Sequence, residues 1–330
     1  MLGIKRREFI AALGGAAAWP LSTRAQPTAL PIVAFINGSS PDASAAYVAA
    51  FRAGLRENGY IDGQSLTIEY HWLEGQYDRL PALIADLVRR RVAVIATPGD
   101  PTAAIAAKAA TSAIPIVFSA GSDPVKLGLV ASLARPGGNA TGMNFFAQEA
   151  VPKRLGLLHE LLPKADRIAV LVDPSDSSIT DTTLQEANAA AGLAGLQIDV
   201  LHAKTSREID EAFATLARQQ AQALMVGQGG YFFSRRVQIV THVTRLGIAT
   251  VFGNRAFADA GGLMSYGTNI GESFRQVGAY AGQILKGTKP ADLPVVQSTR
   301  FQFIINMQTA RVLGIAVPPS LLAQADAVIE

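Results

Sequence analysis

The sequence alternates between strand-like and helix-like segments, and the whole alternation occurs twice. Short apolar runs rich in Val and Ile, each followed by turn residues, lie at 31–36, 66–70, 92–96 and 114–118, and again at 168–172, 196–200, 223–226 and 248–252. Between the runs, apolar residues recur at helical spacing, as Leu80, Leu83 and Leu87 do. These runs predict buried parallel strands, and the two series predict an α/β fold with two similar doubly wound parallel-sheet lobes. A single long mixed sheet is the alternative, and the glycine-rich segment 136–142 between the two series argues against it.

The chain is expected to pass between the two lobes more than once. The candidate crossings lie near 140–146, 261–268 and 293–299. They divide the chain into lobe I, residues 26–141 plus 268–298, and lobe II, residues 142–267 plus 299–330. Several crossings side by side would form a multi-strand hinge about which the lobes close on a ligand.

The N-terminus carries the features of an export signal. A basic start that includes Arg6 and Arg7 is followed by an apolar run at 9–21 and by Ala25 at a site suited to cleavage. Because a membrane-spanning helix needs roughly 20 apolar residues, this run is too short to form a span. The paired arginines resemble the twin-arginine motif, although general secretion also accepts a basic start. We therefore expect cleavage near Ala25 and a periplasmic protein; a buried N-terminal helix is the alternative.

Charge and cysteine content argue against several classes of protein. Loss of residues 1–25 would remove four of the 29 basic and one of the 26 acidic residues, which leaves equal numbers and a formal net charge of zero. A basic surface for nucleic acid is therefore not expected. The chain has no cysteine, which excludes disulfides, thiol nucleophiles and a lipid-bearing cysteine. We expect a monomer with no stable membrane anchor.

Signatures of catalysis and of cofactor binding are also missing from the sequence. The four histidines are far apart, and no metal-binding spacing joins them. The sequence contains no Gly-x-Ser-x-Gly elbow, no P-loop and no complete Gly-x-Gly-x-x-Gly pattern. We therefore predict no metal, no cofactor and no enzymatic activity.

Polar residues follow nearly every predicted strand, where ligands bind in open parallel sheets. The candidate ligand-binding residues are Asn37, Ser39, Ser40, Thr97, Asp100, Ser119 and Asp123 in the first series, Asp173, Ser175, Ser178, Gln228, Tyr231 and Asn254 in the second, and Tyr266 and Asn269 in the returning segment. Trp72, Tyr77 and Phe232 could add apolar walls. Each loop taken singly is equally typical of helix capping and turns. Their joint appearance around one expected cleft favours ligand binding.

Longer motifs resemble one family of periplasmic ABC-transporter substrate-binding proteins, which includes tryptophan-type (aromatic amino-acid) binders. The matching segments are Arg6–Ile10 with Ala25-Gln26, Glu74–Pro81, Asp123–Val130, Arg135–Gly142, Gly261–Gly267 and Leu313–Leu322. The resemblance covers essentially the whole chain. It implies a periplasmic binding protein type I fold, capture of a small-molecule ligand between the lobes, and delivery to an ABC permease in the inner membrane.

The resemblance also implies roles for some loops. Thr97 and residues 119–123 stand where first-lobe loops would hold a ligand carboxylate, and residues 173–178 and 227–231 stand at the second-lobe loops. In the amino-acid binders an aspartate after the glycine of the returning segment faces the ligand amine. Here that segment reads Gly267-Thr268-Asn269 and is neutral. This departure argues against an amino-acid ligand, unless Asp123 or Asp173 takes the role of that aspartate.

The sequence therefore predicts a soluble periplasmic binding component of an ABC importer for a small carboxylated or aromatic, amino-acid-like solute. An exported α/β enzyme acting on a small polar substrate is the alternative. A ligand-sensing module of a signalling receptor would share the fold, and the sequence does not separate it from a transporter component. A DNA-binding repressor is disfavoured because an export signal stands where a helix-turn-helix would be needed.

Overall fold

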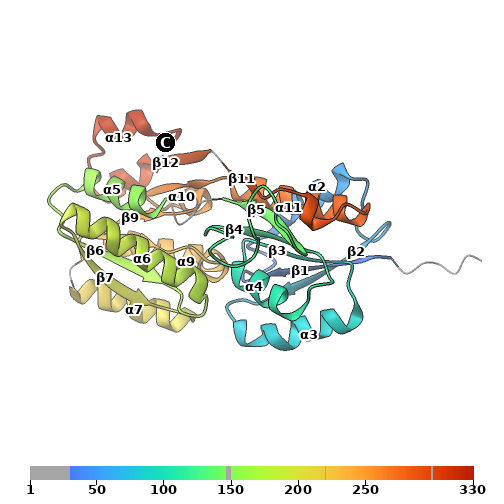
Figure 1. The fold of residues 1–330 in the computed structure, drawn as a ribbon. Coiled ribbons are helices and arrows are strands. Elements are labelled where there is room, and N and C mark those ends of the chain that lie inside the picture. Colours follow the sequence, from blue (N-terminus) through green and yellow to red (C-terminus); the bar gives the residue numbers. More distant parts are fainter. Residues whose placement is uncertain (1–29, 146–149, 220, 299) are drawn as a thin grey trace, which may run out of the picture. The chain divides into compact units, whose positions relative to one another are not determined.

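The computed structural model describes residues 30–145, 150–219, 221–298 and 300–330. The predicted export signal lies outside the described residues. The unit Pro31–Glu330 contains two β-sheets, each flanked by helices on both faces (Figure 1). We refer to the first sheet with its helices as lobe I and to the second as lobe II.

Lobe I is built on a sheet of six parallel strands in the order β11-β5-β4-β3-β1-β2. The strands are β1 (Ile32–Asn37), β2 (Thr67–Trp72), β3 (Val94–Pro98), β4 (Ile116–Ala120), β5 (Ala140–Asn144) and β11 (Val296–Gln297). Helices α3 (Leu80–Arg90) and α4 (Pro101–Ala110) cover one face, and helices α2 (Ala45–Glu57) and α11 (Ile270–Leu285) cover the other. The 3-10 turns at Tyr77–Arg79 and Pro290–Asp292 complete the lobe.

Lobe II is built on a sheet of seven strands in the order β13-β12-β10-β9-β8-β6-β7. The strands are β6 (Arg167–Val172), β7 (Gln197–His202), β8 (Ala223–Val226), β9 (Ala249–Phe252), β10 (Met264–Thr268), β12 (Phe301–Asn306) and β13 (Ala327–Ile329). The helices are α5 (Val151–Leu161), α6 (Ser177–Ala194), α7 (Ser206–Gln219), α8 (Gly230–Ser234), α9 (Arg236–Leu246), α10 (Arg255–Asp259), α12 (Met307–Val312) and α13 (Pro319–Gln324). All named strand pairs are parallel except β10 with β12.

The predicted α/β class with two parallel-dominated sheets is confirmed, since every predicted strand has its counterpart in the structure. The chain passes between the sheets between β5 and α5, between β10 and α11, and between β11 and β12. Strand β5 pairs with β4 of the first sheet as far as Asn144, whereas lobe I was predicted to end at residue 141. Motion of the lobes about these crossings stays a prediction.

Two glycines let α2 and α11 pack with their backbones in contact. A Cβ at Gly54 would overlap the carbonyl oxygen of Arg275, and one at Gly278 would overlap that of Phe51. The contact brings together segments from opposite ends of the chain, and it lies on the sheet face where Phe51 and Val277 are fully buried. Because the two helices are held so closely, the positions of their N-terminal turns are tied to each other.

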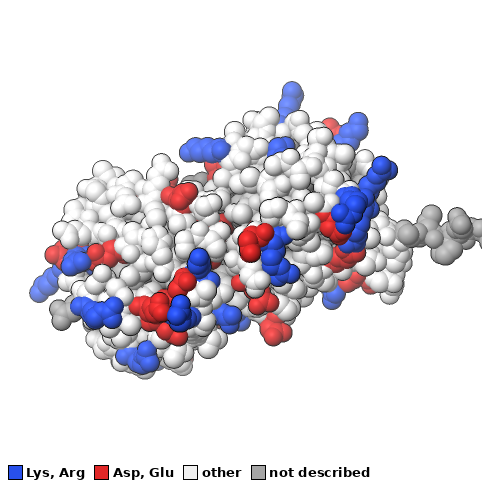
Figure 2. Space-filling model, turned by 90° about the horizontal axis from the view of Figure 1, so that it is seen from below, with Lys and Arg blue, Asp and Glu red and all other residues white. Residues whose placement is uncertain are grey.

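Basic and acidic side chains alternate over much of the face seen in Figure 2. Ion pairs such as Arg52–Asp62 and those of Arg275 with Glu57 and Glu272 lie at the surface of lobe I. Exposed pairs of this kind contribute little to stability, about 0–1 kcal/mol each. The buried apolar clusters of the two lobes are therefore the main source of stability.

Candidate functional site

A cavity with about 730 Å³ of space, part of it open to solvent, is lined from both lobes. Its polar lining residues are Asn37, Ser39, Ser44, Tyr47, Gln228 and Asn254, and its other aromatic residues are Phe145, Phe233, Phe252, Phe257 and Phe274. The polar residues follow β1, β8 and β9 or begin α2, so the cavity lies at the carboxyl ends of the parallel strands. This is where ligands bind in open α/β sheets.

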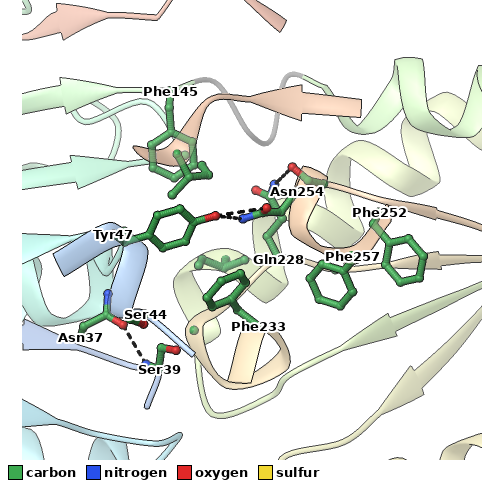
Figure 3. Close-up of a pocket in the computed structure, with 18 of the residues that line it drawn as sticks. Asn37, Ser39, Ser44, Tyr47, Phe145, Gln228, Phe233, Phe252, Asn254 and Phe257 are labelled. Carbon is green, nitrogen blue, oxygen red and sulfur yellow. Dashed lines mark hydrogen bonds between the residues drawn. The ribbon is translucent and has the colours of Figure 1, made fainter. Parts of the chain in front are cut away.

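Tyr47 on α2 connects the two lobes across this cavity. Its ring lies between Phe274 of lobe I and Phe233 of lobe II, with centroid distances of 5.0 and 5.1 Å. The Asn254 Nδ2 of lobe II donates a hydrogen bond of 2.9 Å to the Tyr47 hydroxyl (Figure 3). Burial raises the pKa of Tyr47 above its ordinary value, so the hydroxyl stays neutral at physiological pH. The side chain therefore joins the lobes by ring packing and by a neutral hydrogen bond.

The lobes also meet through their backbones beside the cavity. Gly230 begins α8 of lobe II, and a Cβ there would lie 2.6 Å from the carbonyl carbon of Gly38 and from the Ser39 nitrogen. The Ser39 and Ser234 hydroxyls are 3.0 Å apart across the same boundary. Only a residue without a side chain allows this approach at position 230, since real Cβ atoms essentially never come within 3.0 Å of another heavy atom.

The first turn of α2 is a distinct part of the lining. Ser44 is the N-cap residue of this helix, but its side chain makes no capping hydrogen bond. The Ser44 side chain is buried, with 1% of the residue exposed, and its Oγ has no hydrogen-bond partner. The first backbone amides of a helix have no hydrogen-bond partner within the helix. At this end of the cavity, the Ser44 hydroxyl and the first amides of α2 can therefore donate hydrogen bonds to a ligand.

A second contact between the lobes lies outside the cavity lining and is acidic. The Tyr77 hydroxyl lies 3.4 Å from Asp100 Oδ2 of lobe I and 3.3 Å from Asp176 Oδ2 of lobe II. Thr102 donates a hydrogen bond of 2.7 Å to the other Asp176 oxygen. Burial, together with the nearby Asp176 carboxyl, raises the pKa of Asp100 to about 7. Burial, with a smaller contribution from Asp173, raises the pKa of Asp176 to about 6.

Four of the residues predicted from the sequence line the cavity: Asn37, Ser39, Gln228 and Asn254. The remaining predicted residues are not among its lining residues. Asp100 and Asn269 cap α4 and α11, and Asp123 and Asp173 accept hydrogen bonds from nearby backbone amides. The capping and turn interpretation therefore accounts for the acidic loops.

Other predicted residues lie in strands or at a different surface. Thr97 and Ser119 are fully buried in β3 and β4, and Tyr266 in β10 stacks on Phe301. Ser40 and Ser178 are partly buried and do not line the cavity. Ser175 and Tyr231 line a separate hollow that also includes Lys204 and Arg235.

The aromatic lining was largely missed by the sequence reasoning. Tyr231 and Phe232 were singled out from the sequence, but Phe232 is buried in the core of lobe II, and the ring that lines the cavity is that of Phe233, which was not predicted. Trp72 packs against Phe35 in the core of lobe I, and Tyr77 lies at the acidic contact. Nothing in the sequence distinguished Tyr47, because its role depends on Phe274, which is far away in the chain.

Within the described ranges, no group of three or more His, Asp or Glu side chains is arranged to hold a metal ion. The same part of the chain contains no helix with the length and apolar character needed to cross a bilayer.

Comparison with known proteins gives a consistent result. Residues 30–329 match a family model described as ABC transporter substrate binding protein. A tyrosine-binding protein of Clostridioides difficile is 26% identical over 265 residues, which cover 80% of this chain and 75% of that protein. A Streptococcus pneumoniae ABC domain solved in complex with L-Trp is 26% identical, with a TM-score of 0.79 over 91% of this chain and 100% of that one. A conserved domain protein of Vibrio cholerae is 24% identical, with a TM-score of 0.81 over 90% of this chain and 99% of that one.

Proposed function

The chain belongs to the family of ABC transporter substrate binding proteins, and we propose that it is the periplasmic binding component of an importer. In this proposal the protein captures a small aromatic or carboxylated solute between its lobes, closes on it by a hinge motion, and presents it to a permease of the inner membrane. The tyrosine-binding and L-Trp-bound relatives support an aromatic solute.

The observation that carries the proposal is the composition of the cavity. Aromatic side chains from both lobes surround it, and its polar groups are a few amides and hydroxyls. This combination provides apolar contact for a ring and a small number of oriented hydrogen bonds, as small-molecule sites generally do. An aromatic ligand that buries roughly 150–250 Å² would gain about 4–6 kcal/mol from apolar transfer alone.

The way in which the two lobes share the lining supports the proposed closure. A ligand shifts an open–closed equilibrium only by its difference in affinity for the two states. Asn37 and Phe274 come from lobe I, whereas Gln228 and Phe233 come from lobe II. A solute that contacts both sets binds the closed form more tightly, and that difference drives closure.

The test is to identify a solute and to show that it is released unchanged. We expect native mass spectrometry of the purified protein to detect a retained small molecule, and a thermal-shift screen of metabolites to find compounds of the same class. A ligand at a hundredfold excess over Kd should stabilise the protein by about 2.7 kcal/mol. Failure of every solute to stabilise the protein, together with chemical turnover of any of them, would reject a binding protein.

An exported enzyme is the second candidate, and the acidic contact between the lobes is the observation in its favour. Asp100 and Asp176 have raised pKa values, as catalytic acids often do. Both carboxyls cap helices, however, and neither lines the cavity. Incubation of the protein with its solute, followed by chromatography, separates the two functions because only an enzyme consumes the solute.

A further inference from the structure

The cavity lining contains no charged side chain among the described residues, and this limits the charge that a solute can carry. The carboxyls around it are engaged elsewhere: Asp100 and Asp176 cap helices and meet Tyr77, Asp173 accepts hydrogen bonds from Ser175, and Asp259, whose charge acts on Tyr47, pairs with Arg255. An ammonium group bound in this cavity would therefore lose its water without gaining an acidic partner. Burial of an unpaired charge is strongly unfavourable.

The aromatic rings do not replace the missing carboxylate. A cation can bind over the face of an aromatic ring, provided that the face is open. Tyr47 is packed between Phe233 and Phe274, with interplanar angles of 27° and 34°. The most electron-rich ring in the lining is therefore already in contact with two other rings.

An anion, in contrast, finds two suitable features at one place. The start of α2 carries the positive end of a 13-residue helix, which favours negative charge. Independently, the Ser44 hydroxyl lines the cavity, is buried and has no hydrogen-bond partner. Helices α6 and α11, which also begin near the cavity, differ because the side chains of Asp176 and Asn269 cap them.

Building on the proposed function, we propose that the cavity selects an aromatic solute that carries one carboxylate and no ammonium group. Its carboxylate accepts hydrogen bonds from Ser44 Oγ and from the first backbone amides of α2, and its ring lies against the aromatic lining. The solute class is thus aromatic carboxylic acids rather than aromatic amino acids.

The experiment is calorimetry of the full chain with ligand pairs that differ only in the α-ammonium group. Suitable pairs are 3-phenylpropionate with phenylalanine and indole-3-propionate with tryptophan; 3-phenylpropionamide tests the carboxylate. We expect each acid to bind at least tenfold more tightly than its amino acid and than the amide. Equal or tighter binding of the amino acids would overturn the inference, while the proposed function would stand.

Two variants assign the selectivity to named residues. We expect Ser44→Ala to weaken binding of the acids about tenfold, because a hydrogen bond to a charged group is lost. Ser265→Ala is the matched control: Ser265 is also a buried serine with an unpartnered hydroxyl, but it lies in β10 and does not line the cavity. If both variants bind the acids as the wild type does, the carboxylate does not bind at Ser44.

Asn254→Asp provides a gain of function. Asn254 accepts a capping hydrogen bond from the Ala256 amide, which an aspartate also accepts. The variant loses the donor to the Tyr47 hydroxyl, but its carboxylate can accept a hydrogen bond from that hydroxyl, as Asn254 Oδ1 does, so the fold should be kept. The new carboxylate in the lining should shift the preference at least tenfold toward the amino acids. Absence of binding of both ligand series to the wild type overturns the inference, and the proposed function fails as well if the metabolite screen finds no stabilising solute and one of the solutes is chemically converted.

Discussion

Replacement of Gly230 by alanine should oppose closure without damaging either lobe. The new Cβ would lie 2.6 Å from two backbone atoms of Gly38 and Ser39, where ordinary van der Waals contact begins at 3.4 Å. These atoms belong to the opposite lobe, and backbone cannot move aside as a flexible side chain does. Overpacking of this kind costs typically 1–3 kcal/mol, which corresponds to roughly a 5- to 150-fold rise in Kd if the closed form alone suffers.

The fold of the isolated lobes should tolerate the change. No left-handed backbone angle is found at Gly230, so alanine introduces no strain there. We expect the thermal midpoint of the ligand-free protein to stay near that of the wild type, and calorimetry with the identified solute to show the weaker binding. Small-angle scattering at saturating solute should show a larger radius of gyration for the variant than for the wild type.

Gly192→Ala is the control, because Gly192 lies within α6 and a Cβ there meets nothing within 4 Å. It should bind like the wild type and be stabilised by up to about 1 kcal/mol through helix propensity. The reasoning is refuted if Gly230→Ala binds the solute within twofold of the wild type. That result would mean that the lobes do not approach at this point in the bound state.

Three further predictions concern stability and the contacts between the lobes. Gly278→Ala should lower the free energy of unfolding by about 1–3 kcal/mol in urea titrations, because its Cβ would overlap a carbonyl oxygen of α2; an unchanged midpoint would contradict the close packing. The raised pKa values of Asp100 and Asp176, about 7 and about 6 against an ordinary 3.8, mean that the folded protein holds protons that the unfolded chain has released. Their stabilising contribution should thus be complete below pH 4 and be lost as pH rises to 7. The thermal midpoint of Asp176→Asn should therefore vary less with pH than that of the wild type. Parallel curves of thermal midpoint against pH for the two proteins would show that these two carboxyls do not cause the pH dependence. Tyr47→Phe removes the hydrogen bond to Asn254 but keeps the ring, so solute affinity should fall by about fivefold or less, whereas a larger loss in calorimetry would show that the hydroxyl contacts the solute.

Local sequence patterns predicted the strands well because the signal is carried within each segment. The runs at 31–36 and 168–172 are apolar throughout, and the corresponding strands β1 and β6 are buried along nearly their whole length. The antiparallel pairing of β12 with β10 was not predicted. Strand direction depends on how the chain returns to the sheet, and periodicity does not encode that path.

The residues that line the cavity were predicted only in part, and the reason lies in side-chain direction. Asp100 was proposed as a ligand residue because it follows a strand, yet its carboxyl turns back to cap α4. Asn254 also caps a helix, but it lines the cavity as well. The two residues have similar local signals, and only the packing around each loop separates them.

The sequence by itself determined the repeated strand–helix order and the absence of cysteine chemistry. These features depend on neighbouring residues and on residue type. The tertiary structure alone decided that Tyr47 meets Phe233 and Phe274, and that Ser44 faces a cavity without charged side chains among the described residues. Those contacts join segments far apart in the chain, and they arise only when two sheets and their helices pack against each other.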